Sequence, residues 1–169
     1  LSEYLHRVKG TSLGLVTTAD VFDATPAANA VHTASRGMGT GIVDQYLDDR
    51  HLNGLKVLMG GGRKWFLPNP SNEVKPQAIN GSQRRDSSDY VLPADIVKGW
   101  NATPGVLDSG RDLINDFQAA GFAYAPDHET LAKLGTPDRL LGLFAYSNMN
   151  VAFDKINGRR GKSSIVADY

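Results

Sequence analysis

Two side chains that could bind a metal ion stand close together in the segment Thr17-Thr-Ala-Asp-Val-Phe-Asp23-Ala-Thr25-Pro26. Asp23 offers a carboxylate and Thr25 a hydroxyl, and hard cations such as magnesium take oxygen ligands of these kinds. A structural interpretation also accounts for the pair. Thr25 would cap the helix that follows, and Asp23 would interact favourably with the dipole of that helix. The spacing alone favours the structural interpretation and leaves the metal site open.

A third candidate, Arg36, stands between Ser35 and a run of glycines at positions 37, 39 and 41. A guanidinium group suits the bidentate recognition of phosphate oxygens, because its N–H groups form a planar fork. The alternative is a solvated arginine near the C-terminus of a helix, where its charge is favourable. Without further information, the residue type favours this alternative.

The predicted strand and helix around Asp23, Thr25 and Arg36 determine where these side chains can lie. Residues 13–18 form a short β-branched run after Gly10, which predicts a buried strand. Thr25 and Pro26 then predict a helix over 25–34, with Thr25 at the N-cap and Pro26 at the first helical position. Ten helical residues would span about 15 Å, so Arg36 must reach back toward the helix N-terminus, or the helix must end early.

The rest of the chain alternates strands and helices. Apolar runs predict strands at 55–59, 122–125 and 139–146, and helical spacing predicts helices at 1–9, 42–48, 111–120 and 128–134. We therefore expect an α/β fold, a mostly parallel sheet with helices on both faces. Ligands of such sheets bind beyond the carboxyl ends of the strands, which directs attention to the loop after residues 13–18.

Residues 68–110 differ from this pattern. Their composition shifts to Pro, Asn, Ser, Asp and Gly without clear periodicity, which is typical of an insertion or a functional surface loop. Just before them, Gly60-Gly61-Gly62 ends a strand. This run lacks the spacing of a phosphate-binding loop, so we interpret it as the exit from the strand.

Composition limits the possible partners. A chain of 169 residues suits one domain. Its 18 basic residues balance 18 acidic ones, so neither nucleic acid nor an anionic membrane is an expected partner. No apolar stretch approaches the roughly 18 residues that cross a bilayer. The absence of cysteine excludes disulfides and thiolate chemistry.

Three segments, in order, resemble the alkaline phosphatase family. They are Leu15-Val-Thr-Thr-Ala-Asp-Val-Phe-Asp-Ala-Thr-Pro-Ala-Ala28 with Thr33-Ala-Ser-Arg36, Val57-Leu-Met-Gly-Gly-Gly-Arg-Lys-Trp-Phe66, and Leu140-Leu-Gly-Leu-Phe144. The resemblance covers residues 13–144 and leaves out 68–110. It implies that Thr25 is a magnesium ligand through its hydroxyl and that Asp23 lies beside the metal, through a bound water. It also implies that Arg36 holds two phosphate oxygens.

The resemblance further implies hydrolysis of phosphomonoesters through a phosphoserine intermediate, with zinc as a second cofactor. The serine and the zinc ligands are expected outside this chain, which would be a segment, residues 1–169, of one alkaline-phosphatase-like domain. The chain by itself is then expected to be inactive. The implied partners are the remainder of the phosphatase chain and a phosphate monoester, with a homodimer left open, in the periplasm or outside the cell. The alternatives are a binding or folding unit and a related phosphoryl- or sulfuryl-transfer enzyme.

Overall fold

Four parallel strands form the centre of the computed structural model, which describes residues 1–73, 81–150, 152 and 156. Their bounds are β1 Leu13–Asp20, β2 Leu55–Gly61, β3 Ala123–Ala125 and β4 Leu140–Ala145. The strands stand in the order β1-β2-β4-β3, and each neighbouring pair is parallel. The predicted parallel sheet is therefore confirmed.

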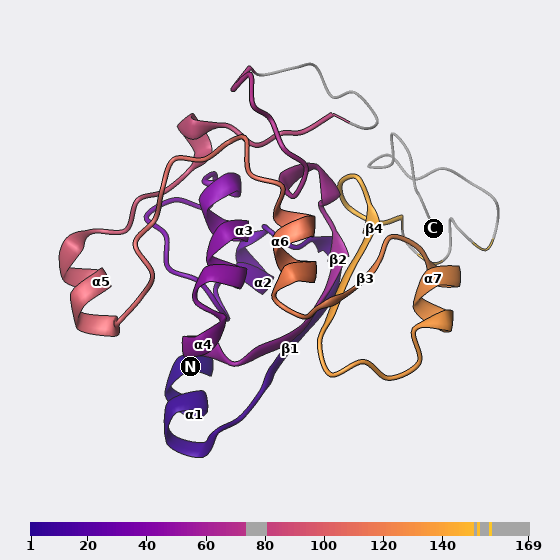
Figure 1. Cartoon of the computed structure of the whole chain (residues 1–169), viewed down its shortest axis with the longest axis horizontal. Helices are drawn as coiled ribbons and strands as arrows, with labels where there is room; N and C mark the ends of the chain where they lie inside the picture. Colours follow the sequence, from indigo (N-terminus) through magenta and orange to yellow (C-terminus); the bar gives the residue numbers. More distant parts are fainter. Residues whose placement is uncertain (74–80, 151, 153–155, 157–169) are drawn as a thin grey trace.

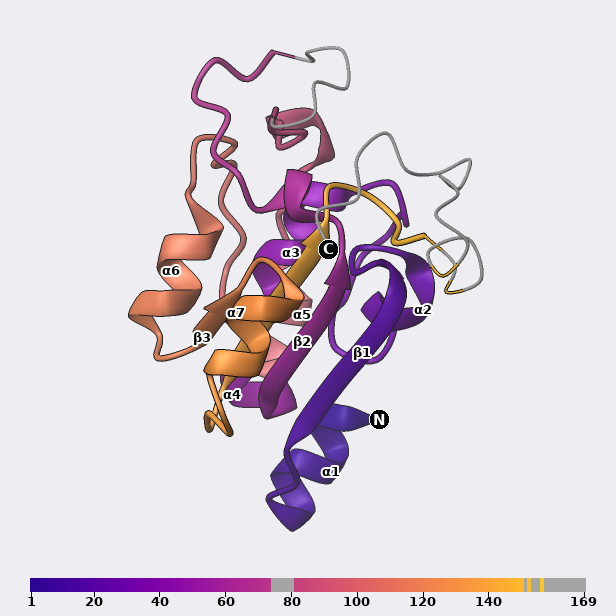
Figure 2. The ribbon, with the colours of Figure 1, turned by 90° about the vertical axis from the view of Figure 1, so that its right-hand side faces the viewer.

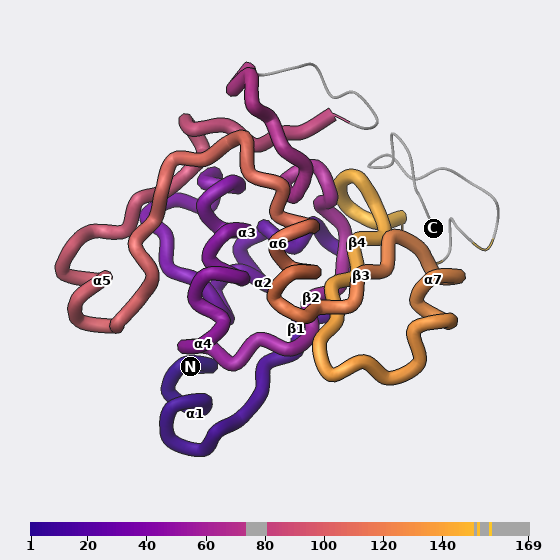
Figure 3. The backbone as a smooth tube through the Cα atoms, in the orientation of Figure 1, coloured from indigo at the N-terminus to yellow at the C-terminus, as the bar shows by residue number. Residues whose placement is uncertain are grey.

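Helices connect the strands and cover the sheet. They are α1 Ser2–Lys9, α2 Ala24–Ala27, α3 Gly39–Asp48, α4 Arg50–Asn53, α5 Ala94–Trp100, α6 Leu113–Ala119 and α7 His128–Lys133, with short 3-10 turns η1 Arg63–Trp65 and η2 Asp86–Ser88. Figure 1 shows α3 and α6 on one side of the sheet and α7 on the other. The tube of Figure 3 and the turned view of Figure 2 show the same two layers around the strands. The expectation of helices on both faces is thus confirmed.

The apolar core lies between the sheet and helices α3 and α6. Its fully buried side chains include Ile42 and Tyr46 of α3, Phe117 of α6, and Leu58 and Leu141 of the central strands. Burying a side chain of this size stabilises the fold by roughly 1.5–3 kcal/mol. The central strand β4 is buried along nearly its whole length, whereas burial alternates along the edge strand β1. The sequence of β4 is continuously apolar because this strand is central, and the sequence of β1 is mixed because this strand lies at the edge.

Two of the described helices, α6 and α7, begin at an aspartate that caps them. The carboxylate of Asp112 accepts the backbone N–H of Asn115 at 3.1 Å, and that of Asp127 accepts the N–H of Thr130 at 2.7 Å. Each therefore satisfies a donor that has no partner inside the helix. Gly10 ends α1 in the left-handed conformation, with φ 65°.

The segment 68–110 is more structured than its composition predicts. It contains η2 and α5, and α5 escaped prediction because it is short and includes Gly99. Part of the segment, 74–80, lies outside the described residues, as do residues 157–162, whose Gly, Arg and Asn content predicts a loop. Among the helices that the structure describes, none is both long and apolar enough to cross a membrane.

Candidate functional site at the carboxyl end of the sheet

The loop after β1 carries Asp23 and Thr25 into α2. The helix begins at Ala24 with Asp23 as its N-cap residue, so the prediction that Thr25 is the cap is wrong. Pro26 is tolerated in the first turn because the first N–H groups of a helix have no partner within it. Thr25 lies inside the helix and is exposed, and its hydroxyl is therefore available to other groups.

Arg36 returns to the beginning of this helix. Helix α2 ends at Ala27 instead of continuing to residue 34, so the helix predicted over 25–34 is wrong in length. The chain folds back, and the Arg36 guanidinium reaches 3.4 Å from Oδ1 of Asp23. Of the two geometries considered from the sequence, the one in which the helix ends early is confirmed.

The turn that carries Arg36 is held by its own hydroxyls. The hydroxyl of Thr33 donates to the carbonyl of Ser35 at 2.9 Å and accepts the Ser35 N–H at 3.2 Å. The hydroxyl of Ser35 accepts the N–H of Gly37 at 3.3 Å. Side-chain to backbone bonds of this kind are typical of Ser/Thr turns, and they fix the direction in which the arginine leaves the chain.

The pair of Arg36 and Asp23 is open to solvent. The Arg36 side chain is 73% exposed and that of Asp23 is 34% exposed. An exposed pair contributes about 0–1 kcal/mol to stability. Either group can therefore leave the ion pair and bind a ligand with little loss of stability.

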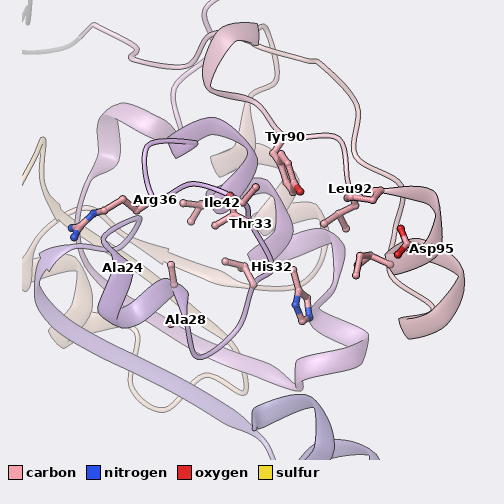
Figure 4. A pocket seen from close by; sticks show the side chains of 14 residues that line it. Ala24, Ala28, His32, Thr33, Arg36, Ile42, Tyr90, Leu92 and Asp95 are labelled. Carbon is pink, nitrogen blue, oxygen red and sulfur yellow. The ribbon is translucent and has the colours of Figure 1, made fainter.

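A pocket of about 650 Å³ lies behind this arginine. Apolar side chains dominate its lining: Ala24, Ala27, Ala28, Val31, Ile42, Leu92, Pro93 and Ile96, with His32, Thr33, Tyr90 and Asp95 among the rest. In Figure 4 the guanidinium of Arg36 lies on the Ala24 side and points away from Tyr90 and Asp95. Only the apolar stem of Arg36 therefore faces the pocket.

A buried ion pair lies beneath the loop and was missed from the sequence. Asp20, the last residue of β1, is 2% exposed, and its Oδ2 lies 3.1 Å from Nζ of Lys64 but out of line for a hydrogen bond. Burial raises the pKa of Asp20 to about 6 against the opposing charge of Lys64. The sequence offered a signal for Asp20 alone, an acidic residue at the end of a predicted strand, and none for its pairing with Lys64.

A second acidic group lies away from this loop. Oxygen atoms of Asp44, Asp89 and Asp108 all lie within 4.8 Å of one another, which could suit a metal ion. Arg84 already binds both oxygens of Asp44, at 2.7 and 2.8 Å, and Oδ1 of Asp108 at 2.9 Å. Arg111 lies 3.6 Å from Asp44. These guanidinium groups balance the carboxylates, so we assign the group a structural role.

His32 and residues 60–62 have structural roles. Nε2 of His32 lies 2.7 Å from Oε1 of Glu3, and its ring centroid is 5.6 Å from that of Trp100. Residues 60–62 end β2, with Gly62 at φ 95°, as predicted for an exit from the strand.

The comparison with sequence families decides the class of protein. The sequence model described as alkaline phosphatase matches residues 4–160. The chain belongs to the alkaline phosphatase family. The matched range runs through residues 68–110, which the resemblance in the sequence left out.

Curated alkaline phosphatases are similar to the chain over most of its length. Alkaline phosphatase 4 of Bacillus subtilis is 28% identical over 150 residues, which cover 87% of this chain and 23% of that protein. The tissue-nonspecific alkaline phosphatase of Gallus gallus is 26% identical over 164 residues, covering 88% and 28%. The chain thus spans about a quarter of the length of these relatives.

Solved alkaline phosphatases share the fold. The Thermus thermophilus enzyme has a TM-score of 0.57 at 26% identity, over 88% of this chain and 23% of that one. A magnesium-bound variant of the alkaline phosphatase from the Antarctic bacterium TAB5 has a TM-score of 0.54 at 16% identity, over 86% and 30%. At that lower identity the likeness concerns the fold alone.

Proposed function

We propose that the protein hydrolyses phosphomonoesters through a phosphoserine intermediate, and that this chain supplies the arginine that binds the phosphate. Membership of the alkaline phosphatase family supports phosphomonoester hydrolysis in general. The observation that carries the assignment to Arg36 is its approach to Asp23, at 3.4 Å, with the guanidinium largely in solvent. A guanidinium held at the carboxyl end of a parallel sheet can present two N–H groups to a phosphate.

Asp23 and Thr25 form part of a magnesium site in this proposal. Their donor set fits the ion, because a carboxylate and a hydroxyl are oxygen ligands and both are accessible from solvent. Thr25 would bind through its hydroxyl and Asp23 through a water, and magnesium usually keeps several waters. When bound, the ion would offset negative charge on Asp23 and on the phosphate. Membership of the alkaline phosphatase family supports a metal cofactor in general.

Zinc is the second proposed cofactor, with its ligands outside this chain. Zinc takes His, Cys and carboxylate ligands, usually three or four together. Within the described part of the chain, no group of three such ligands gathers around Arg36. Because the chain spans about a quarter of its relatives' length, we propose that the zinc ligands and the nucleophile lie in the rest of the phosphatase. This chain alone would then bind phosphate without turnover.

A second candidate is a binding or folding unit, and α1 favours it. None of the residues in α1 is buried, and Leu1, Leu5 and Val8 expose 88%, 36% and 49% of their surface. An exposed apolar stripe of this kind is usual at a contact surface. Sedimentation that depends on chain concentration would favour this candidate over a catalytic role.

Phosphate binding to variants of the chain tests the proposal. We expect Arg36→Ala to weaken inorganic phosphate binding, followed by ³¹P NMR, by about ten- to hundredfold, because a charged hydrogen bond contributes about 1.5–3 kcal/mol. Arg36→Lys should recover only part of it, since lysine cannot bind in a bidentate manner. The control is Arg7→Ala, at an exposed arginine of α1. Equal affinity of the Arg36 and Arg7 variants would refute the assignment.

A further inference from the structure

Three strand ends meet at one buried charge pair. Asp20 ends β1, Lys64 follows β2, and Ser147 and Asn148 follow β4. Nζ of Lys64 lies 3.1 Å from Oδ2 of Asp20 and donates to Oγ of Ser147 at 2.9 Å. The backbone N–H of Asp20 donates to Oδ1 of Asn148 at 2.7 Å. The pair therefore ties three neighbouring strands together beneath the loop of Asp23.

The pair is expensive to bury. Asp20 is 2% exposed and Lys64 is 9% exposed. The ammonium group lies 5.7–5.9 Å from the ring centroids of Phe22, Trp65 and Tyr146, which offsets part of its lost hydration. Replacing a buried ion pair by uncharged side chains of similar size is often neutral or stabilising. Stability alone therefore gives no reason for this pair.

Asp20 holds the loop that carries the proposed ligands. Its Oδ1 accepts the backbone N–H of Phe22 at 3.2 Å, and its carbonyl accepts the N–H of Asp23 at 2.9 Å. The ring of Phe22 packs against Trp65, with centroids 4.9 Å apart. Asp23 is thus held directly by a backbone hydrogen bond to Asp20. Helix α2, which contains Thr25, starts at the next residue.

We propose that the Asp20–Lys64 pair is a positioning element, which holds the Phe22–Thr25 loop so that Asp23 and Thr25 present their oxygens to one magnesium ion. The inference rests on the magnesium site proposed above. Neither residue touches the ion or the phosphate. Oδ2 of Asp20 accepts no hydrogen bond among the described residues, so the charge of Lys64 is what fixes that oxygen. Removing the pair releases the loop and leaves the core intact.

The test is the double variant Asp20→Asn/Lys64→Met, which removes both buried charges together. Its melting temperature should stay close to that of the wild-type chain. Hydrogen exchange at the Phe22 and Asp23 amides, measured without metal, should become at least about tenfold faster. Magnesium binding, followed by NMR titration, should weaken by about tenfold or more, as for partners that orient ligands. If the pair only stabilised the fold, a double variant as stable as the wild-type chain would keep the same amide exchange at Phe22 and Asp23. It would also keep the same magnesium affinity.

The control is Lys56→Met/Asp138→Asn, a Lys–Asp pair whose Nζ to Oδ1 distance is 2.7 Å but which lies at the other end of β2 and is exposed at Asp138. It should change neither readout. Unchanged exchange at Phe22 and Asp23 in the Asp20/Lys64 double variant would overturn the positioning role. If the double variant does not fold, Asp20→Asn alone, which keeps the side-chain shape, serves for the same exchange measurement. Absence of magnesium binding by the wild-type chain would instead overturn the proposed site, while exchange would still decide the positioning.

Discussion

Arg84 and Asp44 form a two-pronged ion pair, with Nη1 2.7 Å from Oδ1 and Nη2 2.8 Å from Oδ2. The side chain of Arg84 is completely buried. A second carboxylate, from Asp108, lies 2.9 Å from Nη2. The pair joins helix α3 to the segment 81–110, in which Leu92 and Ala102 are the only buried apolar residues. Arg84 therefore fixes this segment against the core.

Breaking this pair on one side should destabilise the whole fold. Arg84→Met leaves the buried carboxylate of Asp44 without its main partner, and such losses cost about 3–5 kcal/mol. We expect this decrease in the free energy of unfolding from urea denaturation followed by circular dichroism. Arg7→Met, at an exposed arginine, should change it by less than about 0.5 kcal/mol. Similar losses in the two variants would show that Asp44 does not depend on Arg84.

The stability of the fold should depend on pH through Asp20. Its pKa is raised by burial from 3.8 to about 6, so the folded chain holds a proton between about pH 4 and 6 that the unfolded chain has released. This contribution is fully present below pH 4 and is lost as the pH rises through 6. A shift of about two units at about 1.4 kcal/mol per unit gives a loss on the order of 3 kcal/mol.

Urea denaturation at several pH values between 4 and 7 measures this loss. The Asp20→Asn variant cannot titrate at this position, so the difference in unfolding free energy between wild type and variant should change across the window. Parallel pH profiles for the two chains would mean that Asp20 keeps an ordinary pKa.

Gly62 should tolerate no side chain. Its φ is 95°, and a Cβ at this position would overlap Oδ1 of Asp20. We expect Gly62→Ala to lower the free energy of unfolding by at least about 2 kcal/mol, since strain and overlap act together.

Gly99 provides the matched comparison for Gly62. It lies in α5, and no other described heavy atom approaches within 4 Å of an added Cβ. Gly99→Ala should therefore raise the free energy of unfolding by about 0.5–1 kcal/mol. Thermal unfolding of both variants measures the contrast. Loss of stability at Gly99 would point to a contact that the described residues do not contain.

Asp23 should compete with phosphate for Arg36 when magnesium is absent. Because the two side chains lie 3.4 Å apart in solvent, Asp23→Asn removes a competing anion that contributes up to about 1 kcal/mol. We expect phosphate to bind up to about fivefold more tightly to this variant at low ionic strength. Isothermal titration calorimetry with and without magnesium measures it. Magnesium should strengthen phosphate binding to the wild-type chain only. Weaker binding to the variant without metal would argue against the competition.

The sheet could be predicted from the sequence because each strand is marked by a short run of neighbouring residues. Apolar runs between helical patterns gave all four described strands, and helical spacing predicted α6 and α7. Local patterns of this kind depend on side-chain periodicity and on capping.

The length of α2 could not be predicted, because tertiary contacts override helix propensity there. The N–H of His32 donates to the side chain of Gln45 at 2.9 Å, and the carbonyl of Ala30 accepts from Asn53 at 3.1 Å. These bonds satisfy backbone groups that a longer helix would have used. The Asp20–Lys64 and Arg84–Asp44 pairs were also out of reach, because their partners are distant in sequence and no spacing relates them.

The two tryptophans of the chain lie in opposite surroundings. Trp65 is 6% exposed and packs on Phe22, next to the loop of Asp23, whereas Trp100 is 51% exposed. The molecule therefore carries a buried fluorophore, Trp65, beside its proposed site. A second fluorophore, Trp100, can be reached by a dissolved quencher such as iodide. Under iodide, the remaining fluorescence comes mainly from Trp65. Loop movement at the site therefore becomes visible in the unlabelled protein.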